Sequence, residues 1–315
     1  MRITYLTGLA AGAALAASCA PAEMAGPQQA SAWRPSPVAN AADPSETVKN
    51  APASAWRDID PQNLLIMDLK NSARVAIELA PQFTPVHVAN IRALARAGWW
   101  NNASIYRVQD NYVVQWGIGD VEKPFPAGVV KLPPAEYDRP LAGLAIRPLG
   151  FPDPYAPAVG HVDGWPVAYD PAGGRAWLTH CYAHVGVARD LAPDTGSGSE
   201  LYTVIGHAPR HLDLNIATVG RVIEGLDRLT PIPRGTEALG FIKDPARQVP
   251  IATVRIAADM PAGERPAFQV MRSDSEAFSA YVLGRANRTG AFFARHQAGG
   301  VDLCNVSVPI RRKTP

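Results

Sequence analysis

Hydrophobic and polar residues alternate in two neighbouring stretches between residues 104 and 120, and this alternation is typical of β-strands. The polar residues Gln109-Asp110-Asn111 separate the stretches, so we predict two antiparallel strands joined by a turn. Arg107 lies among the apolar and aromatic residues of the first strand. A guanidinium in such surroundings is costly unless it is paired or used, which makes Arg107 the first candidate for chemistry.

The preceding residues predict two more strands and a helix. Residues 63–69 and 74–79 are rich in branched apolar residues and flank a polar turn, so we predict a strand pair there. Thr84-Pro85 then has the form of a helix start. Apolar residues follow at helical spacing as far as Gly98, which is suited to end a helix.

Later parts of the chain give weaker patterns. Residues 251–257 alternate and predict a closing strand. Pro231 and Pro233 are expected to cut short any helix that precedes this closing strand. Near the C-terminus we predict a helix over 273–288 and a strand over 301–306.

The first 57 residues predict export and a flexible connection. Arg2 precedes an apolar run and the small residues Ser18-Cys19-Ala20, an order typical of a secretory signal peptide, which we assign to residues 1–20. Two outcomes stay open, a lipid anchor to the envelope through Cys19 or a soluble periplasmic product. Residues 21–57 are rich in Ala, Pro, Ser and Gln, so we predict a disordered tether there.

Composition narrows the class of protein. The chain has 315 residues, of which 47% are hydrophobic and 18% charged, so it can bury a sizeable core. Its 30 prolines and 26 glycines favour many turns over a helix bundle. A net charge of +2 gives no electrostatic reason to expect nucleic acid as a partner.

The strand pair at residues 104–120 resembles the signature of the cyclophilins, the barrel-type peptidyl-prolyl cis/trans isomerases. That signature is phenylalanine, histidine, arginine, a turn, an aromatic residue and a glutamine-glycine-glycine-aspartate run. The matching residues are Ile105-Tyr106-Arg107, Tyr112 and Gln115-Trp116-Gly117-Ile118-Gly119-Asp120. Asn90 in the predicted helix matches the family's asparagine.

Further blocks extend the resemblance. Residues 185–202 match the family's alanine strand, its glycine- and serine-rich turn and the strand that follows, and residues 207–227 match its last signature. The resemblance implies a mainly β fold, namely a closed antiparallel cyclophilin-like eight-stranded barrel with one or two flanking helices. We assign residues 58–260 to this domain and expect a monomer.

Two segments lie outside the resemblance. Residues 121–177 form a long Pro/Gly-rich insertion, and its aromatic residues lead us to expect that it packs on the barrel. Residues 261–315 form a C-terminal extension, which we also expect to pack on the barrel. If Cys19 is removed with the signal peptide or lipidated, Cys181 and Cys304 are the two cysteines that remain. We hypothesise that they form a disulfide in an oxidising compartment.

The resemblance implies an enzyme that isomerises X-Pro bonds of extended or unfolded polypeptides without a cofactor. Arg107 would be the catalytic residue, because a donor at the prolyl nitrogen helps only once amide resonance is lost. The proline ring needs an apolar cup with an aromatic wall. Four residues fall where the family builds it: Tyr112, Val113, Tyr202 and Leu212.

The remaining candidate residues would hold the peptide. Gln115 would orient the substrate carbonyl or Arg107, while Ala188 and Arg189 would offer backbone hydrogen bonds to an extended chain. Arg189 replaces the family's asparagine and could favour acidic peptides.

Three departures from the family's pattern concern the site. Glu200 replaces a glutamine and could pair with Arg107, His211 replaces the common tryptophan, and Ile216 stands where many relatives have histidine. The alternative function is therefore a catalytically weak or inactive peptide-binding or scaffold protein of the cell envelope. A metal site using His180, His184, His207 and His211 is a remote option, since residues four apart lie far apart along a strand; we predict no metal.

Overall fold

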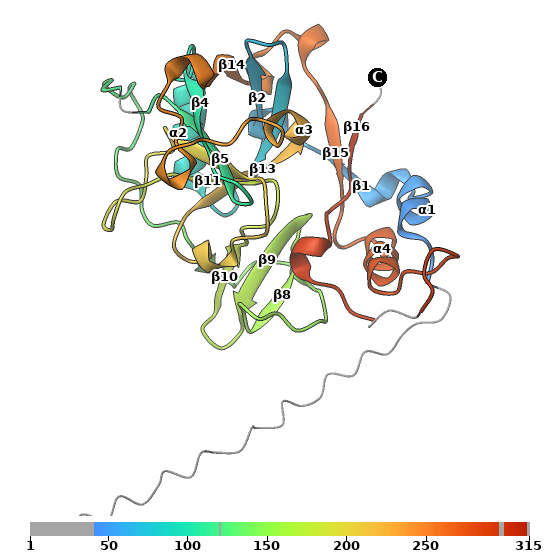
Figure 1. The fold of residues 1–315 in the computed structure, drawn as a ribbon. Helices are drawn as coiled ribbons and strands as arrows, with labels where there is room; N and C mark the ends of the chain where they lie inside the picture. Colours follow the sequence, from blue (N-terminus) through green and yellow to red (C-terminus); the bar gives the residue numbers. More distant parts are fainter. Residues whose placement is uncertain (1–40, 120, 296–298, 314–315) are drawn as a thin grey trace, which may run out of the picture. The chain divides into compact units, whose positions relative to one another are not determined.

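Eight antiparallel strands close into a barrel in the order β11-β12-β5-β4-β14-β2-β3-β13. The computed structural model describes residues 41–119, 121–295 and 299–313, and Figure 1 shows the chain. The barrel strands are β2 (Leu64–Leu69), β3 (Arg74–Leu79), β4 (Ser104–Val108), β5 (Val113–Gly117), β11 (His184–Val187), β12 (Leu201–Val204), β13 (Thr218–Glu224) and β14 (Val249–Ile256). The predicted mainly β fold with a closed eight-stranded barrel is confirmed.

The barrel core explains the alternation seen in the sequence. Val114 and Trp116 of β5 belong to one buried apolar cluster, which also contains Ile91 and Leu94 of helix α2. Successive side chains of a strand point to opposite faces, so the other residues of β5 face the outside of the barrel. Full burial of each such apolar side chain stabilises the fold by about 1.5–3 kcal/mol.

Helix α2 (Pro85–Arg96) begins after Thr84 as predicted, with proline at its first position. The Thr84 hydroxyl donates to the Ala80 carbonyl rather than capping the helix. Gly98 has a φ of +63°, a conformation that glycine adopts without strain. The Asn90 amide donates to the carbonyls of Val130 and Ser197 at 2.8 Å each. Helix α2 is therefore hydrogen-bonded to two separate loops.

The insertion contains a sheet of its own, which the sequence did not predict. Its strands, in the order β6-β10-β9-β8-β7, are β6 (Arg139–Pro140), β7 (Arg147–Pro148), β8 (Ala158–Val162), β9 (Trp165–Asp170) and β10 (Arg175–Leu178). Trp165 and Leu178 of this sheet pack in one cluster with Ala80 and Phe83 from the segment that joins β3 to α2. The insertion therefore packs against the barrel domain, as expected.

Segments from both ends of the described chain form a third sheet, in the order β1-β15-β16. These strands are β1 (Trp56–Asp58), β15 (Phe268–Met271) and β16 (Ile310–Arg312), and the neighbouring helices are α1 (Pro44–Lys49) and α4 (Glu276–Ala286). Figure 1 shows α1 beside α4. The helix predicted over 273–288 is confirmed by α4.

Two predictions for these terminal segments need correction. Residues 44–58 form α1 and β1 rather than a disordered tether, because the Asp43 carboxylate accepts from the N–H groups of Ser45 and Glu46 and so caps α1. Residues 303–305 form a 3₁₀ turn rather than a strand, because Asp302 accepts from the N–H groups that follow it. The predicted signal peptide, Cys19 and the first part of the tether lie outside the described residues.

The remaining helical elements are short. Helix α3 (Leu226–Leu229) ends before Pro231 as predicted. The 3₁₀ helices are η1 (Ala53–Ala55), η2 (Pro61–Asn63), η3 (Arg210–Leu212), η4 (Ala238–Gly240), η5 (Pro245–Arg247), η6 (Ala257–Asp259), η7 (Ala262–Glu264) and η8 (Leu303–Asn305). Within residues 41–313, apart from the undescribed positions, we find no helix with the length and hydrophobicity needed to cross a membrane.

Cys181 and Cys304 form a disulfide with an S–S distance of 2.02 Å, which confirms the hypothesis drawn from the cysteine count. The two cysteines are 123 residues apart. The bond joins the segment between β10 and β11 to the C-terminal extension.

Candidate functional site

Four strands place a row of residues on the outer face of the barrel. Arg107 of β4 pairs with Gln115 of β5, Gln115 pairs with Tyr202 of β12, and Tyr202 pairs with Gly186 of β11. Directly paired residues lie on the same face of a sheet. The barrel therefore brings Tyr202 onto the same face as Arg107 and Gln115, two predicted site residues from a much earlier part of the sequence.

The Arg107 guanidinium is held by three neutral oxygens. Its Nε donates to the Leu239 carbonyl at 2.8 Å, Nη1 to Gln115 Oε1 at 2.9 Å and Nη2 to Gln109 Oε1 at 2.6 Å. Burial lowers the pKa of Arg107, but an arginine stays charged at neutral pH. The side chain is thus a fixed cation whose contacts here do not neutralise its charge.

The segment that contains η4 forms a wall beside Arg107, and sequence reasoning missed it. The Phe241 ring centroid lies 5.4 Å from Arg107 Cζ, close enough for a cation–π contact. Phe241 also stacks on Tyr106 with ring centroids 6.2 Å apart. The only local signal was an aromatic residue in a stretch without periodicity, so this wall could not be assigned from the sequence.

The predicted cup residues lie together. Val113, Tyr202 and Val204 form a small buried cluster. Four partly buried residues pack against it, namely Tyr112, Ala188, Leu212 and Ile216. His211 stacks on Tyr112 with ring centroids 6.1 Å apart. The result is an apolar surface with aromatic walls, next to the row that carries Arg107.

The hydroxyl of Tyr202 is satisfied within the protein. His180 Nε2 lies 2.9 Å from Tyr202 Oη, and His180 Nδ1 lies 3.0 Å from Asp213 Oδ1. Since the carboxylate only accepts, Nδ1 donates to it. A Cβ at position 186 would lie 2.3 Å from the Tyr202 ring, so Gly186 is needed for the tyrosine to lie flat across β11.

Asp213 continues this buried polar network into the insertion. Arg210 Nε donates to Asp213 Oδ2 at 2.5 Å, and the terminal nitrogens of Arg210 donate to Asp153 at 2.9 and 3.2 Å. Although burial opposes it, hydrogen bonding to His180 and the charge of Arg210 lower the pKa of Asp213. The insertion is thereby bonded to η3, which carries His211 and Leu212.

Glu200 bonds to groups other than the guanidinium. Its Oε2 accepts from Tyr106 Oη at 2.7 Å and its Oε1 from the Ile118 N–H at 2.9 Å. Burial and the nearby Glu200 charge raise the pKa of Tyr106. A Cβ at Gly117 would lie 1.8 Å from Glu200 Oε2, so any side chain at this position would displace the Glu200 carboxylate.

The segment Ala188-Arg189 lies beside the cup. The Arg189 side chain and the Ala188 N–H already make hydrogen bonds within the protein. The Ala188 N–H donates to the Glu200 carbonyl at 2.9 Å. Arg189 donates to the Asn215 carbonyl at 2.9 Å and to the Asp190 carbonyl at 2.7 Å. The Arg189 guanidinium is therefore fixed against the neighbouring loop.

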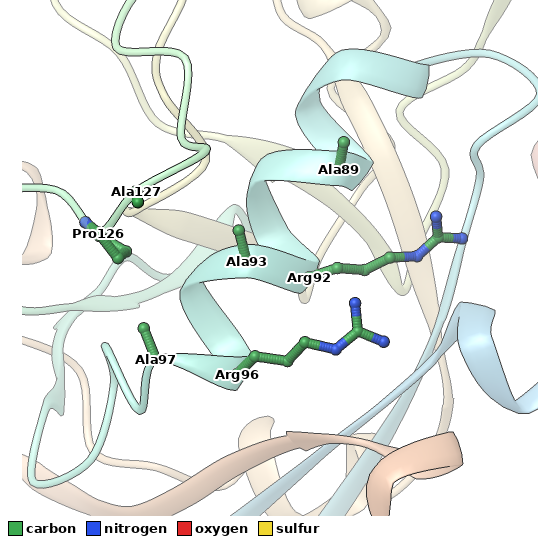
Figure 2. Close-up of a pocket in the computed structure, with 7 residues that line it drawn as sticks. All are labelled: Ala89, Arg92, Ala93, Arg96, Ala97, Pro126 and Ala127. Carbon is green, nitrogen blue, oxygen red and sulfur yellow. The ribbon is translucent and has the colours of Figure 1, made fainter.

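A cavity of about 980 Å³ lies next to the row, and Tyr106, Gln115, Glu200 and Phe241 are among the residues that line it. Its size is in the range of small-molecule and peptide sites. A second hollow of about 570 Å³ lies along α2 (Figure 2) and contains none of the predicted site residues. Figure 2 shows Ala93 and Ala97 on the side of α2 towards Pro126 and Ala127, while Arg92 and Arg96 extend away. Arg96 is ion-paired with Asp259.

Two of the histidines considered as metal ligands, His180 and His184, have other contacts. His180 bonds to Asp213 and Tyr202, His184 bonds to the Thr179 carbonyl, and Cys181 is in the disulfide. In the part of the chain that the structure describes, no three His, Cys, Asp or Glu side chains are placed to hold a metal ion.

Comparison with known proteins identifies relatives. The family described as cyclophilin type peptidyl-prolyl cis-trans isomerase/CLD matches residues 64–256. Proteins named probable peptidyl-prolyl cis-trans isomerase from Brucella suis and Brucella melitensis are each 28% identical over 190 residues, covering 59% of this chain and 80% of theirs. The crystal structure of cyclophilin AquaCyp293 from Hirschia baltica aligns with a TM-score of 0.63 and 25% identity, over 82% of this chain and 93% of that one.

Proposed function

Because the chain belongs to the cyclophilin-type peptidyl-prolyl cis-trans isomerase family, we propose that it isomerises X-Pro bonds of extended or unfolded polypeptides, with Arg107 stabilising the twisted amide. One observation supports this most strongly: the Arg107 guanidinium, held by neutral acceptors, shares a barrel face with Gln115 and Tyr202 beside an apolar surface.

The proposed mechanism follows from the electronic change in the amide. Rotation about an X-Pro bond must break amide resonance, with a barrier of about 20 kcal/mol. In the twisted state the prolyl nitrogen gains a lone pair, and a terminal N–H of Arg107 donates to it. This bond exists only when resonance is lost, so it lowers the barrier without tightening ground-state binding. No covalent bond changes, and no cofactor is needed.

The surrounding groups would hold the substrate. The proline ring sits on the surface formed by Tyr112, Val113, Tyr202 and Leu212, with His211 extending its edge. The Ala188 N–H is already bonded to Glu200, so backbone contacts to the peptide come from the remaining groups of Ala188 and Arg189. The cavity lined by Gln115 and Glu200 takes the chain that flanks the proline.

A proline-peptide isomerisation assay on the full chain tests the role of Arg107. We expect Arg107→Ala to lower kcat roughly 100-fold, the usual cost of removing a donor to transition-state charge. Arg228→Ala removes an exposed charge whose ion pair is with Asp227 and is a matched control that should keep the wild-type rate. Background rates in both the wild type and Arg107→Ala would instead favour the alternative, a peptide-binding protein without catalysis.

We also propose that the chain acts outside the cytoplasm. The order of residues 1–20 and the Cys181–Cys304 disulfide support export, since such bonds persist in oxidising compartments. We expect the chain recovered from the envelope fraction of producing cells to begin at or just after Cys19. Mass spectrometry of that N-terminus also separates a lipidated from a soluble product, and recovery from the cytoplasm with residues 1–20 intact would refute export.

A further inference from the structure

Glu200, Tyr106, Gln115 and Arg107 form a continuous series of side-chain hydrogen bonds, which we call the orienting chain. Tyr106 Oη donates to Glu200 Oε2 at 2.7 Å and accepts from Gln115 Nε2 at 2.7 Å. Gln115 Oε1 then accepts from Arg107 Nη1 at 2.9 Å. The Gln115 side chain is buried, and Tyr106 and Glu200 are partly buried, so water competes weakly with these bonds.

The two ends of the orienting chain, Glu200 and Arg107, have fixed roles in hydrogen bonding. A carboxylate can only accept hydrogen bonds and an arginine can only donate them. Glu200 therefore commits the Tyr106 proton, which leaves the tyrosine oxygen to accept from the Gln115 amide. That amide must then turn its oxygen towards Arg107. Each bond in the orienting chain has one allowed direction.

We propose that Glu200 is a positioning residue, which acts through Tyr106 and Gln115 to hold the Arg107 guanidinium in its working orientation. The proposal rests on the proposed isomerase function and reverses the role that the sequence suggested for Glu200. The negative charge does not silence the arginine. It sets the hydrogen-bond directions that keep the Gln115 oxygen available to it.

The carboxylate is required because at least two donors point at Glu200. Its Oε1 accepts from the Ile118 N–H at 2.9 Å while Oε2 accepts from Tyr106. A glutamine of the same shape has one oxygen and cannot serve both. If that oxygen faces Ile118, the glutamine N–H donates to the Tyr106 oxygen. The tyrosine must then donate its proton to Gln115, whose side-chain amide is reversed. The reversed Gln115 presents its N–H groups to Arg107, which also only donates.

The first test is Glu200→Gln in the full chain, assayed with a proline peptide. Because the reversed Gln115 presents N–H groups to Arg107 and displaces the guanidinium from its working orientation, we expect kcat to fall about tenfold with KM changed less than about twofold. Tyr106→Phe should lower kcat by a similar factor. Tyr281→Phe, which also removes one buried hydroxyl bond, to the Ser307 carbonyl, is the matched control and should keep the wild-type kcat.

The double variant separates positioning from direct substrate contact. With Phe at 106, a glutamine at 200 can turn its oxygen to Ile118 without disturbing Gln115. We therefore expect Tyr106→Phe/Glu200→Gln to match Tyr106→Phe alone. Multiplicative losses, a wild-type kcat in Glu200→Gln, or a loss confined to KM would overturn the proposal.

A measurement without substrate tests the orienting chain independently of the proposed isomerase function. In nuclear magnetic resonance spectra, we expect Glu200→Gln to shift the side-chain amide signals of Gln115, and Tyr281→Phe to leave them in place. Unmoved signals would contradict the orienting chain even if activity fell. If Arg107→Ala kept the wild-type rate while the Gln115 signals shifted, the catalytic role of Arg107 would fail and the hydrogen-bond chain would stand.

Discussion

At the scale of single residues, Phe241 adds a contact to the hydrogen bonds that hold the Arg107 guanidinium. Its ring lies over the guanidinium, and the same short segment supplies the Leu239 carbonyl that accepts from Nε. Phe241 is 38% exposed, so the ring contributes modestly to the buried core. Its ring makes a cation–π contact with Arg107 and stacks on the neighbouring Tyr106.

We expect Phe241→Ala to lower kcat about fivefold, because a cation–π contact is worth about 1 kcal/mol at a partly exposed site. Phe241→Tyr keeps the ring and should restore most of the rate. Phe292→Ala, at a residue that is 90% exposed, is the control for loss of a surface phenylalanine. A rise in KM with kcat unchanged would show that Phe241 contacts substrate and does not hold the arginine.

At the scale of elements, the barrel strands and α2 could be predicted because their signals are local. Strands β4, β5 and β14 alternate over five to eight residues, and β2 and β3 are rich in branched apolar residues. Thr84-Pro85 with Gly98 delimits the helix within a similarly short window. Arg107, Gln115 and Tyr202 could be named from the resemblance. That they share one face follows from the register of β4, β5 and β12, which the sequence alone does not state.

Elements that depend on distant pairing could not be predicted. Strand β6 consists of Arg139–Pro140 and exists because Arg175 and Ala176 of β10 pair with it. In the third sheet, Trp56 pairs with Met271, across more than 200 residues of sequence. A strand of two residues is too short to show a hydrophobic periodicity, and a pairing partner so distant in the sequence gives no signal in the neighbouring residues.

Two departures from the family's pattern gained meaning only together. In the sequence, Tyr106 in place of histidine and Glu200 in place of glutamine are separate differences, 94 residues apart. In the structure they are hydrogen-bonded to each other. The sequence suggested that Glu200 could compete for Arg107, because a sequence does not show that the Glu200 carboxylate is bonded to Tyr106.

At the scale of the whole described chain, buried charges join the barrel, the insertion and the third sheet. Glu78 of β3 accepts from Arg221 of β13 and from Arg57 of β1. Arg221 also donates to the Gly164 carbonyl and Arg57 to the Asp163 carbonyl, both in the insertion. Loss of one partner would leave an uncompensated buried charge, at a cost of roughly 3–5 kcal/mol.

The same junction contains two histidines that make the fold sensitive to acid. His161 of β8 and His184 of β11 are almost fully buried, and burial lowers the pKa of each to about 3. The charge of Arg221 acts in the same direction on both. In the unfolded chain a histidine has a pKa of about 6.5, so the unfolded state binds more protons between these values.

Stability contributed by these histidines is therefore fully present above about pH 6.5 and is lost as the pH falls towards 3. Each can contribute a slope of up to about 1.4 kcal/mol per pH unit in that window. Asp68 and Asp213 have lowered pKa values, so their stabilisation is lost only below about pH 4. The range from pH 6.5 to 4.5 thus reports mainly on the buried histidines.

We expect the free energy of unfolding, measured in denaturant, to decrease from pH 7 to pH 4.5. In His161→Phe this decrease should be smaller, because the substitution removes up to half of the contribution from the two histidines. Asp163, whose pKa is raised by burial, acts in the opposite direction, but it is present in both proteins and cancels in the comparison. His207→Asn is the matched control, since an exposed ring changes its hydration little on folding. Parallel pH dependences for the wild type and His161→Phe would mean that His161 is not held neutral in the fold, and the acid sensitivity would then have to come from other groups.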